Sequence, residues 1–586
     1  MFKLMKNFSK KDMLLVFFSL FLVFIQVWLE LKIPDYMSSI TTLIQRDGSN
    51  MGDILLQGGY MLSCALGSLI AAIFVGYFIS LVAANSSLML REKIFKKVGS
   101  FSNSEIKEFS TSSLITRTTN DVTQIEILIS MGLQMIFRAP IMAIMAISKI
   151  IDKSLTWSAL TGGCLVILLI TVITLIIIVM PRFEIVQKLI DKINGVTREN
   201  LTGIRVIRAF NAEGYQEGRF GKVNDDLTKN QMFNQKCFAI LNPMINLVMH
   251  FLTLGIYFIG AYLISNAALG LKISLFSDMI VFSSYGMQVI MSFLMLAMIF
   301  MIWPRASVSA RRINEVLEKP ISIIDGNRNT FDNKQKGVVE FKNVSFKYPD
   351  ADEYLLKNIS FKVNKGEVIA FIGSTGSGKS TLINLVPRFY DVTDGEVTID
   401  GINIKDYSLE ALHNKLGYVP QKAVMFTGTV SSNVAYGESL KKITDKKIKE
   451  AIKVAQGEEF VLSMPDKYES HIARGGTNVS GGQKQRLAIA RAIARDPEIY
   501  IFDDSFSALD YKTDLILRKE LKKYTKDATC MIVAQRIGTI INADKIVVLD
   551  KGECVGIGTH EYLLKNCEVY REIALSQLSK EELENA

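Results

Sequence analysis

Cysteine is scarce in this sequence, and the few cysteines lie far apart. The 586 residues contain six, and their spacing is neither that of metal ligands nor that of a small secreted protein held together by disulfides. They are Cys64, Cys164, Cys237, Cys530, Cys554 and Cys567. We therefore expect reduced, structural thiols.

The sequence also has little that would indicate a secreted or a nucleic-acid-binding protein. The first apolar run is too long for the apolar region of a signal peptide and has no small-residue cleavage site, so we expect no cleaved leader. The net charge is +9, but the basic residues lie mainly in loops beside membrane segments, where membrane topology accounts for them. We expect no binding to nucleic acid.

Charge is unevenly distributed along the chain. Hydrophobic residues make up 49% and charged residues 21% of the sequence, and most long uncharged runs precede Arg305. A chain of this length exceeds what one hydrophobic core supports. The composition therefore indicates an apolar membrane domain followed by a soluble domain.

Six apolar runs are long enough to cross a bilayer, which takes about 20 residues. They lie near residues 13–31, 58–84, 131–151, 154–181, 238–266 and 279–304. The loops after the second and fourth runs are rich in lysine and arginine, which places those loops and both termini in the cytoplasm. The sequence thus predicts a multi-pass protein of the cytoplasmic membrane, in contact with the lipid bilayer. The expected tips of the two long loops are residues 113–124 and 210–220.

After residue 337 the chain alternates strand-like and helix-like segments, which indicates an α/β domain. A strand ending near Ile372 leads into a GxxxxGKS loop followed by a helix, the context that a phosphate-binding loop requires. Its residues, with the next threonine, are Gly373, Ser374, Thr375, Gly376, Ser377, Gly378, Lys379, Ser380 and Thr381. Backbone N–H groups and the lysine would hold the phosphates of ATP, and the Ser380 hydroxyl would ligate Mg²⁺.

A second motif supports a nucleotide site. The apolar run IYIF ends at Asp503, and a carboxylate at the end of a buried strand is suited to hold magnesium. We expect a membrane domain over residues 1–305, a linker over 306–337, a nucleotide-binding domain over 338–575 and a charged tail over 576–586.

Between these motifs lies a segment that identifies a family. Ser480, Gly481, Gly482 and Gln483 belong to the string VSGGQ, which resembles the signature of ATP-binding cassette (ABC) proteins, and six preceding spans resemble their exporter type. The resemblance implies a six-span α-helical domain fused to an α/β cassette. It also implies a head-to-tail pair of cassettes, in which the signature of one closes the ATP site of the other. Ser480 and the glycine backbone at a helix N-terminus would offer that anion site.

The resemblance assigns further roles by position. Tyr348 would stack on adenine, Gln421 would sense magnesium and the membrane domain, and residues 507–510 would join the two sites. The two loop tips would be coupling helices, with solvated helical hairpins as the alternative. The expected metal-site residues are Ser380, Gln421 and Asp503.

Two catalytic positions depart from the family pattern. The glutamate that polarises the attacking water is replaced by Asp504, whose carboxylate is one methylene shorter, and the histidine near the γ-phosphate is replaced by Gln535. A general base must lie within hydrogen-bond reach of its target, so we expect ATP to be held but poorly cleaved. This pattern resembles the degenerate subunit of heterodimeric bacterial exporters, which predicts a second ABC half-transporter as partner. A slow homodimer remains the alternative.

The cargo is not identified by any single residue. Five methionines of the sixth span, at 287, 291, 295, 298 and 301, form a helical stripe that suits either apolar ligands or helix packing. Arg138 lies within a span and would face the interior or pair structurally. By resemblance we expect export of lipophilic compounds or drugs. Haem, lipid or peptide export and siderophore uptake are the alternatives.

Overall fold

The computed structural model describes residues 9–46, 49–151, 155–329, 336–437 and 442–577. The chain forms two compact units. The first comprises the membrane helices up to Lys319, and the second comprises residues 320 onward together with the short segment Ser100–Thr111.

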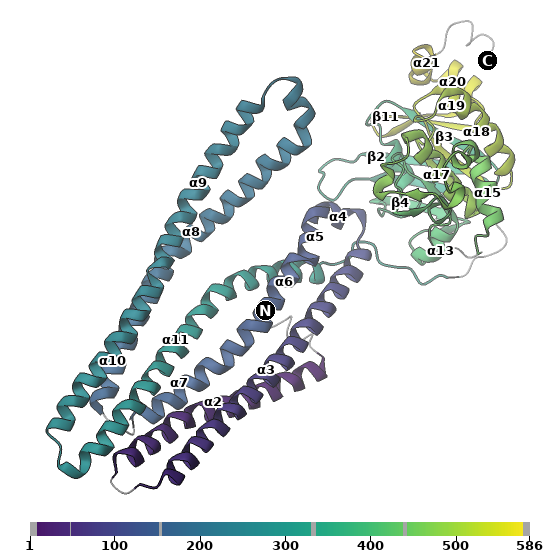
Figure 1. Cartoon of the computed structure of the whole chain (residues 1–586). Coiled ribbons are helices and arrows are strands. Elements are labelled where there is room, and N and C mark those ends of the chain that lie inside the picture. Colours follow the sequence, from purple (N-terminus) through teal and green to yellow (C-terminus); the bar gives the residue numbers. More distant parts are fainter. Residues whose placement is uncertain (1–8, 47–48, 152–154, 330–335, 438–441, 578–586) are drawn as a thin grey trace. The chain divides into compact units, whose positions relative to one another are not determined.

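The first unit consists of long helices, and six of them are long and apolar enough to span a membrane, as predicted. Proline lies beyond the first turn in four of these helices, at positions 34, 140, 181 and 304. The spanning helices continue well beyond the apolar runs (Figure 1). The helices are α2 (Lys10–Gln45), α3 (Met51–Gly99), α5 (Thr111–Thr118), α6 (Asn120–Ile127), a π-helical turn (Leu128–Gly132), α7 (Leu133–Ile151), α8 (Leu155–Ala209), α9 (Glu213–Ala239), α10 (Leu241–Ser265) and α11 (Leu269–Glu318).

The first long loop turns earlier than the sequence indicated. Helix α3 ends at Gly99, a short helix α4 (Asn103–Phe109) follows, and α5 already returns toward the membrane domain. The expected tip at residues 113–124 was therefore wrong, because these residues belong to the two helices α5 and α6 that follow the turn. The second turn lies between α8 and α9 at residues 210–212, inside the expected range.

An arginine and a glutamate within the spans form an ion pair. Arg138 Nη2 donates to both carboxylate oxygens of Glu30 at 3.0 Å. Gln26 Nε2 and Ser68 Oγ donate to the same carboxylate at 3.0 and 3.2 Å. This cluster ties α2, α3 and α7 together, so Arg138 has the structural role considered from the sequence.

The second unit is built on two sheets. A four-stranded antiparallel sheet has the order β2-β1-β4-β5, and a six-stranded sheet has the order β12-β11-β3-β10-β9-β6. The strands are β1 (Val339–Phe346), β2 (Leu356–Val363), β3 (Val368–Gly373), β4 (Asp394–Ile399), β5 (Ile402–Asn403), β6 (Leu416–Val419), β9 (Ile499–Asp503), β10 (Thr529–Val533), β11 (Lys545–Asp550) and β12 (Glu553–Gly558), with a small pair β7 (Gly428–Thr429) and β8 (His471–Ile472).

Helices cover the larger sheet, and alternate residues of its strands enter different cores. Ile499 and Ile501 of β9 pack in one cluster, while Tyr500 and Phe502 pack in the other. A strand buried on both faces is typical of a parallel α/β sheet. The helices are α12 (Lys379–Asn384), α13 (Leu409–Asn414), α14 (Val430–Val434), α15 (Asp445–Val454), α16 (Glu458–Leu462), α17 (Gly481–Ala494), α18 (Tyr511–Tyr524), α19 (Ile537–Ile540), α20 (His560–Asn566) and α21 (Glu568–Leu575), with 3₁₀ turns at Lys467–Glu469 and Arg474–Gly476.

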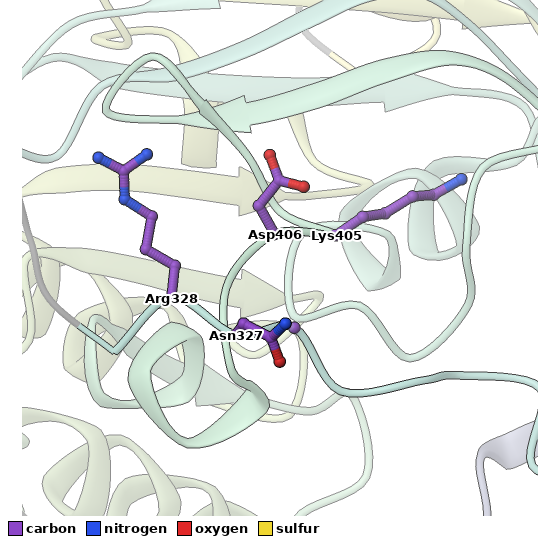
Figure 2. Close-up of a pocket in the computed structure, with 5 residues that line it drawn as sticks. Asn327, Arg328, Lys405 and Asp406 are labelled. Atoms are coloured by element: carbon purple, nitrogen blue, oxygen red, sulfur yellow. The ribbon is translucent and has the colours of Figure 1, made fainter.

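The chain enters this unit along the edge of the antiparallel sheet. Helix α11 runs to Glu318, past the expected boundary at residue 305. Gly326 and Arg328 then donate backbone hydrogen bonds to Tyr407 and Asp406 at 3.1 and 3.0 Å. A shallow hollow lies beside this contact, lined by residues 326–328, 405 and 406 (Figure 2). None of the predicted nucleotide-binding residues lines it.

Candidate nucleotide-binding site

The parallel sheet brings the predicted site residues to one edge. Strands β6, β9, β10 and β3 are neighbours and run parallel. Gln421 lies two residues after β6, Asp503 ends β9, Gln535 follows β10 by two residues and the phosphate loop follows β3. The carboxyl ends of parallel strands meet at the same edge, where α/β proteins bind ligands.

The phosphate loop has a backbone that requires glycine. Gly376 has φ of +86° and an added Cβ there would meet nothing within 4 Å, so the loop surface is open. At Gly373 an added Cβ would come within 2.0 Å of the Leu549 carbonyl oxygen. Such a loop presents its N–H groups to an anion, which fits the phosphates of a nucleotide.

Lys379 is poised over this loop. Its ammonium donates to the carbonyl oxygens of Gly373 and Ser374 at 2.9 and 2.7 Å. Burial lowers the pKa of Lys379 from its ordinary value, although the nearby charges of Asp504 and Asp503 act in the opposite direction. A cation held by neutral carbonyls can exchange them for phosphate oxygens.

Ser380 and Asp503 form the candidate metal pair. Ser380 Oγ donates to Asp503 Oδ1 at 2.8 Å, so the two oxygens expected to hold magnesium lie side by side. The pKa of Asp503 is raised, mainly by burial and further by Asp504, while Ser380 and Lys379 oppose the shift. A hydroxyl and a carboxylate are the hard oxygen ligands that Mg²⁺ prefers, and with phosphate oxygens they fit that ion. When bound, Mg²⁺ would neutralise phosphate charge at this edge.

The departures from the family pattern converge on one carboxylate oxygen. Gln535 Nε2 and Gln421 Nε2 both donate to Asp504 Oδ2, at 2.8 and 3.1 Å. The backbone of Asp504 has φ of +46°, in the left-handed region. In the structure the Gln421 amide donates to Asp504, and its place beside magnesium stays a prediction. Neither sequence spacing nor motif order indicated that the two glutamines share this acceptor.

A residue near the C-terminus supports the loop that carries Gln535. Gln577 Nε2 donates to the Gln535 carbonyl oxygen, and the Ile537 amide donates to Gln577 Oε1, both at 2.8 Å. Gln577 lies beyond the last helix, in a segment without any motif, so sequence reasoning did not single it out. Its two hydrogen bonds bridge both ends of the loop that follows β10.

The remaining predicted residues occupy two further places. Tyr348 lies beside the phosphate loop, where its hydroxyl is 3.0 Å from Thr381 Oγ1. The signature begins α17, where Ser480 Oγ accepts from the Gln483 amide at 3.3 Å and Gln483 Oε1 accepts from the Ser480 amide at 2.9 Å. In the described part of the chain, the side-chain hydrogen bonds of Ser480 and Gln483 stay within the signature. Gly482 packs close to residues 507–510, because an added Cβ would lie 3.3 Å from the Ala508 carbonyl oxygen.

Comparisons with known proteins show the family of this chain. Residues 16–303 match the family described as the ABC transporter transmembrane region, and residues 356–507 match the ABC transporter family. The chain is 38% identical over 92% of its length to an uncharacterized ABC transporter ATP-binding protein, Rv1273c of Mycobacterium tuberculosis, covering 93% of it. It is 31% identical over 85% of its length to the putative multidrug export ATP-binding/permease protein YgaD of Bacillus subtilis, covering 84% of it.

A solved structure shares the fold. The structure of a bacterial Atm1-family ABC exporter with ATP bound aligns with a TM-score of 0.81 at 23% identity, over 96% of this chain and 98% of that one. Both domains are covered by the alignment. The chain therefore belongs to the ABC transporters, as an exporter-type half-transporter with a six-helix membrane domain fused to an ATPase domain.

Proposed function

We propose that this chain is the degenerate-site subunit of a heterodimeric exporter, which binds ATP at its own phosphate loop but cleaves it slowly. The observation that carries the proposal is the pair of glutamine amides on Asp504 Oδ2. A carboxylate oxygen that accepts two hydrogen bonds is less available to accept a proton from water, and its side chain is one methylene short of the family's base.

The elements that hold nucleotide support the same proposal. The phosphate loop, Lys379 and the Ser380–Asp503 pair retain the geometry that phosphate and magnesium require. The signature is complete and caps α17, so it could close the ATP site of a second half-transporter. On this proposal the partner supplies a glutamate and a histidine at the positions of Asp504 and Gln535, and most turnover occurs there.

The decisive experiment uses the purified full chain in lipid nanodiscs. The wild-type chain is expected to bind ATP with slow hydrolysis, whereas Asp504→Glu combined with Gln535→His should raise the rate roughly 100-fold, the usual scale of a general base. Lys379→Ala in the double variant serves as the control that removes the added activity. A wild-type rate equal to that of the double variant would refute the proposal.

Orientation and cargo belong to the same proposal. Lysine and arginine in the two long loops support cytoplasmic placement of both termini. Protease digestion of sealed inside-out vesicles tests this placement, because a cytoplasmic ATP-binding unit would be cleaved after residue 320.

For cargo we propose lipophilic compounds, since Met287, Met291 and Met298 of α11 are 36–46% exposed in the isolated chain. The Met301 side chain lies outside the described residues.

The cargo is tested in cells that produce this chain with its partner. Replacing the three exposed methionines of α11 by alanine should lower resistance to lipophilic toxic compounds, because a polarizable surface is lost. Met180→Ala on α8, which is 53% exposed, is the matched control. Unchanged resistance with normal protein levels would contradict a role for the methionines.

A further inference from the structure

The short helix between the second and third spans belongs to the ATP-binding unit. Residues 100–111 group with that unit and not with the membrane helices. Helix α4 begins with a capping box, in which Ser102 Oγ accepts from a backbone amide and Glu105 Oε2 accepts from the Ser102 amide at 2.7 Å. The rings of Phe101 and Phe109 stack across it, with centroids 5.8 Å apart. This anchoring gives its outer side chains defined positions.

Lys107 of this helix lies on the tyrosine expected to stack on adenine. Its ammonium is 4.8 Å from the ring centroid of Tyr348 and 5.8 Å from that of Tyr390. The two rings are perpendicular, at 89° with centroids 5.3 Å apart, so the ammonium sits in the notch between them. A cation over an aromatic face is attracted by the ring quadrupole.

Tyr348 is held on its other sides by this unit's own residues. Its hydroxyl contacts Thr381 Oγ1 in the phosphate-loop helix at 3.0 Å, and the Phe346 ring packs at 81° to it. The ring is thus oriented beside the phosphate loop. The ammonium of Lys107 covers a surface on which a base could stack.

We propose that Lys107 and the adenine base compete for the face of Tyr348, so that nucleotide binding displaces the lysine. The inference rests on the proposed role of Tyr348 in nucleotide binding. Both ligands are attracted to the same π surface, and a base about 3.5 Å from the ring leaves no room for an ammonium over that face. Lys107 therefore lowers the affinity for nucleotides by competing with the adenine base, and it does not affect the binding of the phosphates.

Helix α4, which carries Lys107, is also hydrogen-bonded to the first residues of the ATP-binding unit. Glu105 Oε1 accepts from the Ser322 amide at 3.2 Å, and the hydroxyls of Ser102 and Ser322 are 2.9 Å apart. Ser322 lies four residues after the end of α11. Displacement of Lys107 thus acts on a helix that is bonded to the segment directly following the sixth span.

The test measures equilibrium binding to the full chain in nanodiscs, using ATP, ADP and tripolyphosphate as probes. Lys107→Met keeps an unbranched side chain of nearly the same length and removes its charge. We expect it to raise affinity for ATP and for ADP by about two- to fivefold, the range of an exposed cation–π contact. Affinity for tripolyphosphate, which has no base, should not change. Lys107→Arg should keep the wild-type affinities, because arginine retains the competing cation.

A matched control is available in the same unit. Lys449 lies 5.5 Å from the ring centroid of Tyr468 and is not among the predicted nucleotide-binding residues, so Lys449→Met should leave all three affinities unchanged. Lower or unchanged ATP affinity in Lys107→Met would overturn the competition.

Tyr348→Ala distinguishes the role of Tyr348 in adenine binding from the competition of adenine with Lys107. If it weakens ATP binding while Lys107→Met has no effect, the competition fails and the role of Tyr348 stands. If Tyr348→Ala leaves ATP binding unchanged, the adenine role fails and the competition with it. Slow hydrolysis by the wild-type chain is measured separately and does not depend on either result.

Discussion

The membrane unit and the ATP-binding unit place charge and apolar surface in opposite ways. In the membrane unit large apolar side chains point outward, with Leu155 83% and Phe258 77% exposed, and the Glu30 and Arg138 charges lie against each other. In the ATP-binding unit apolar residues fill two cores, and the predicted phosphate-binding groups and the carboxylates gather at one sheet edge. The surrounding solvent explains the difference, because lipid offers no hydrogen bonds to an unpaired charge.

Arg138→Met is the strongest test of this comparison. Among the residues that the structure describes, it leaves the Glu30 carboxylate with Gln26 and Ser68 as donors. Loss of one partner from a desolvated pair costs about 3–5 kcal/mol, so we expect a clear fall in the thermal unfolding temperature of the reconstituted chain. Adding Glu30→Gln should recover much of the loss. Equal stability of the single and double variants would show that the unpaired Glu30 charge is not the cause of the loss.

Lys415→Met makes the corresponding change in the ATP-binding unit. Lys415 pairs with Asp400 at 2.7 Å and with Glu498 at 2.6 Å. The Lys415 and Asp400 side chains are each 3% exposed, but water surrounds this unit and can reach Glu498, which is 32% exposed. We therefore expect a loss of about 3 kcal/mol, at the lower end of the range for a broken buried pair. Thermal unfolding of the same preparation measures it. A larger loss than for Arg138→Met would contradict the role assigned to the lipid.

Gln577→Ala probes a neutral contact at the surface. It removes the two hydrogen bonds to the loop of Gln535, worth about 1 kcal/mol together at an exposed site. Hydrogen exchange of the Ile537 amide should become roughly fivefold faster. Gln577→Glu keeps an acceptor for that amide and should preserve its protection. Unchanged exchange in Gln577→Ala would show that the loop is held by other contacts.

Lys96→Ala tests a charge pair of the first unit that lies outside the apolar segment. Lys96 and Glu92 are 73% and 58% exposed on α3. Surface pairs contribute little to stability, and we expect no measurable change in unfolding temperature. A loss comparable to that of Arg138→Met would show that ion pairs stabilise this unit even where water, and not lipid, surrounds them.

Sequence patterns predicted the parts of this fold that repeat along the chain. Apolar run length predicted six spans, and strand-loop-helix motifs predicted the phosphate loop and the α/β unit. The position of the first turn was not predicted, because charged helical residues continue past the membrane on both sides of it. Contacts between residues far apart in the sequence were not predicted either. Gln421, Asp504 and Gln535 come from three different strand ends, and only the order β10-β9-β6 brings them together.

The left-handed backbone at Asp504 bears on how this site could change over time. Residues other than glycine are uncommon there, and aspartate is several-fold enriched because its short polar side chain bonds locally. Glutamate gains reach at that position but is less common than aspartate in this backbone conformation. Under the proposed function, a change from glutamate to aspartate would relieve backbone strain while it lowers catalytic power, and the reverse change would reintroduce the strain. Once a partner subunit carries out hydrolysis, the change to aspartate is therefore easier to fix in evolution than its reversal.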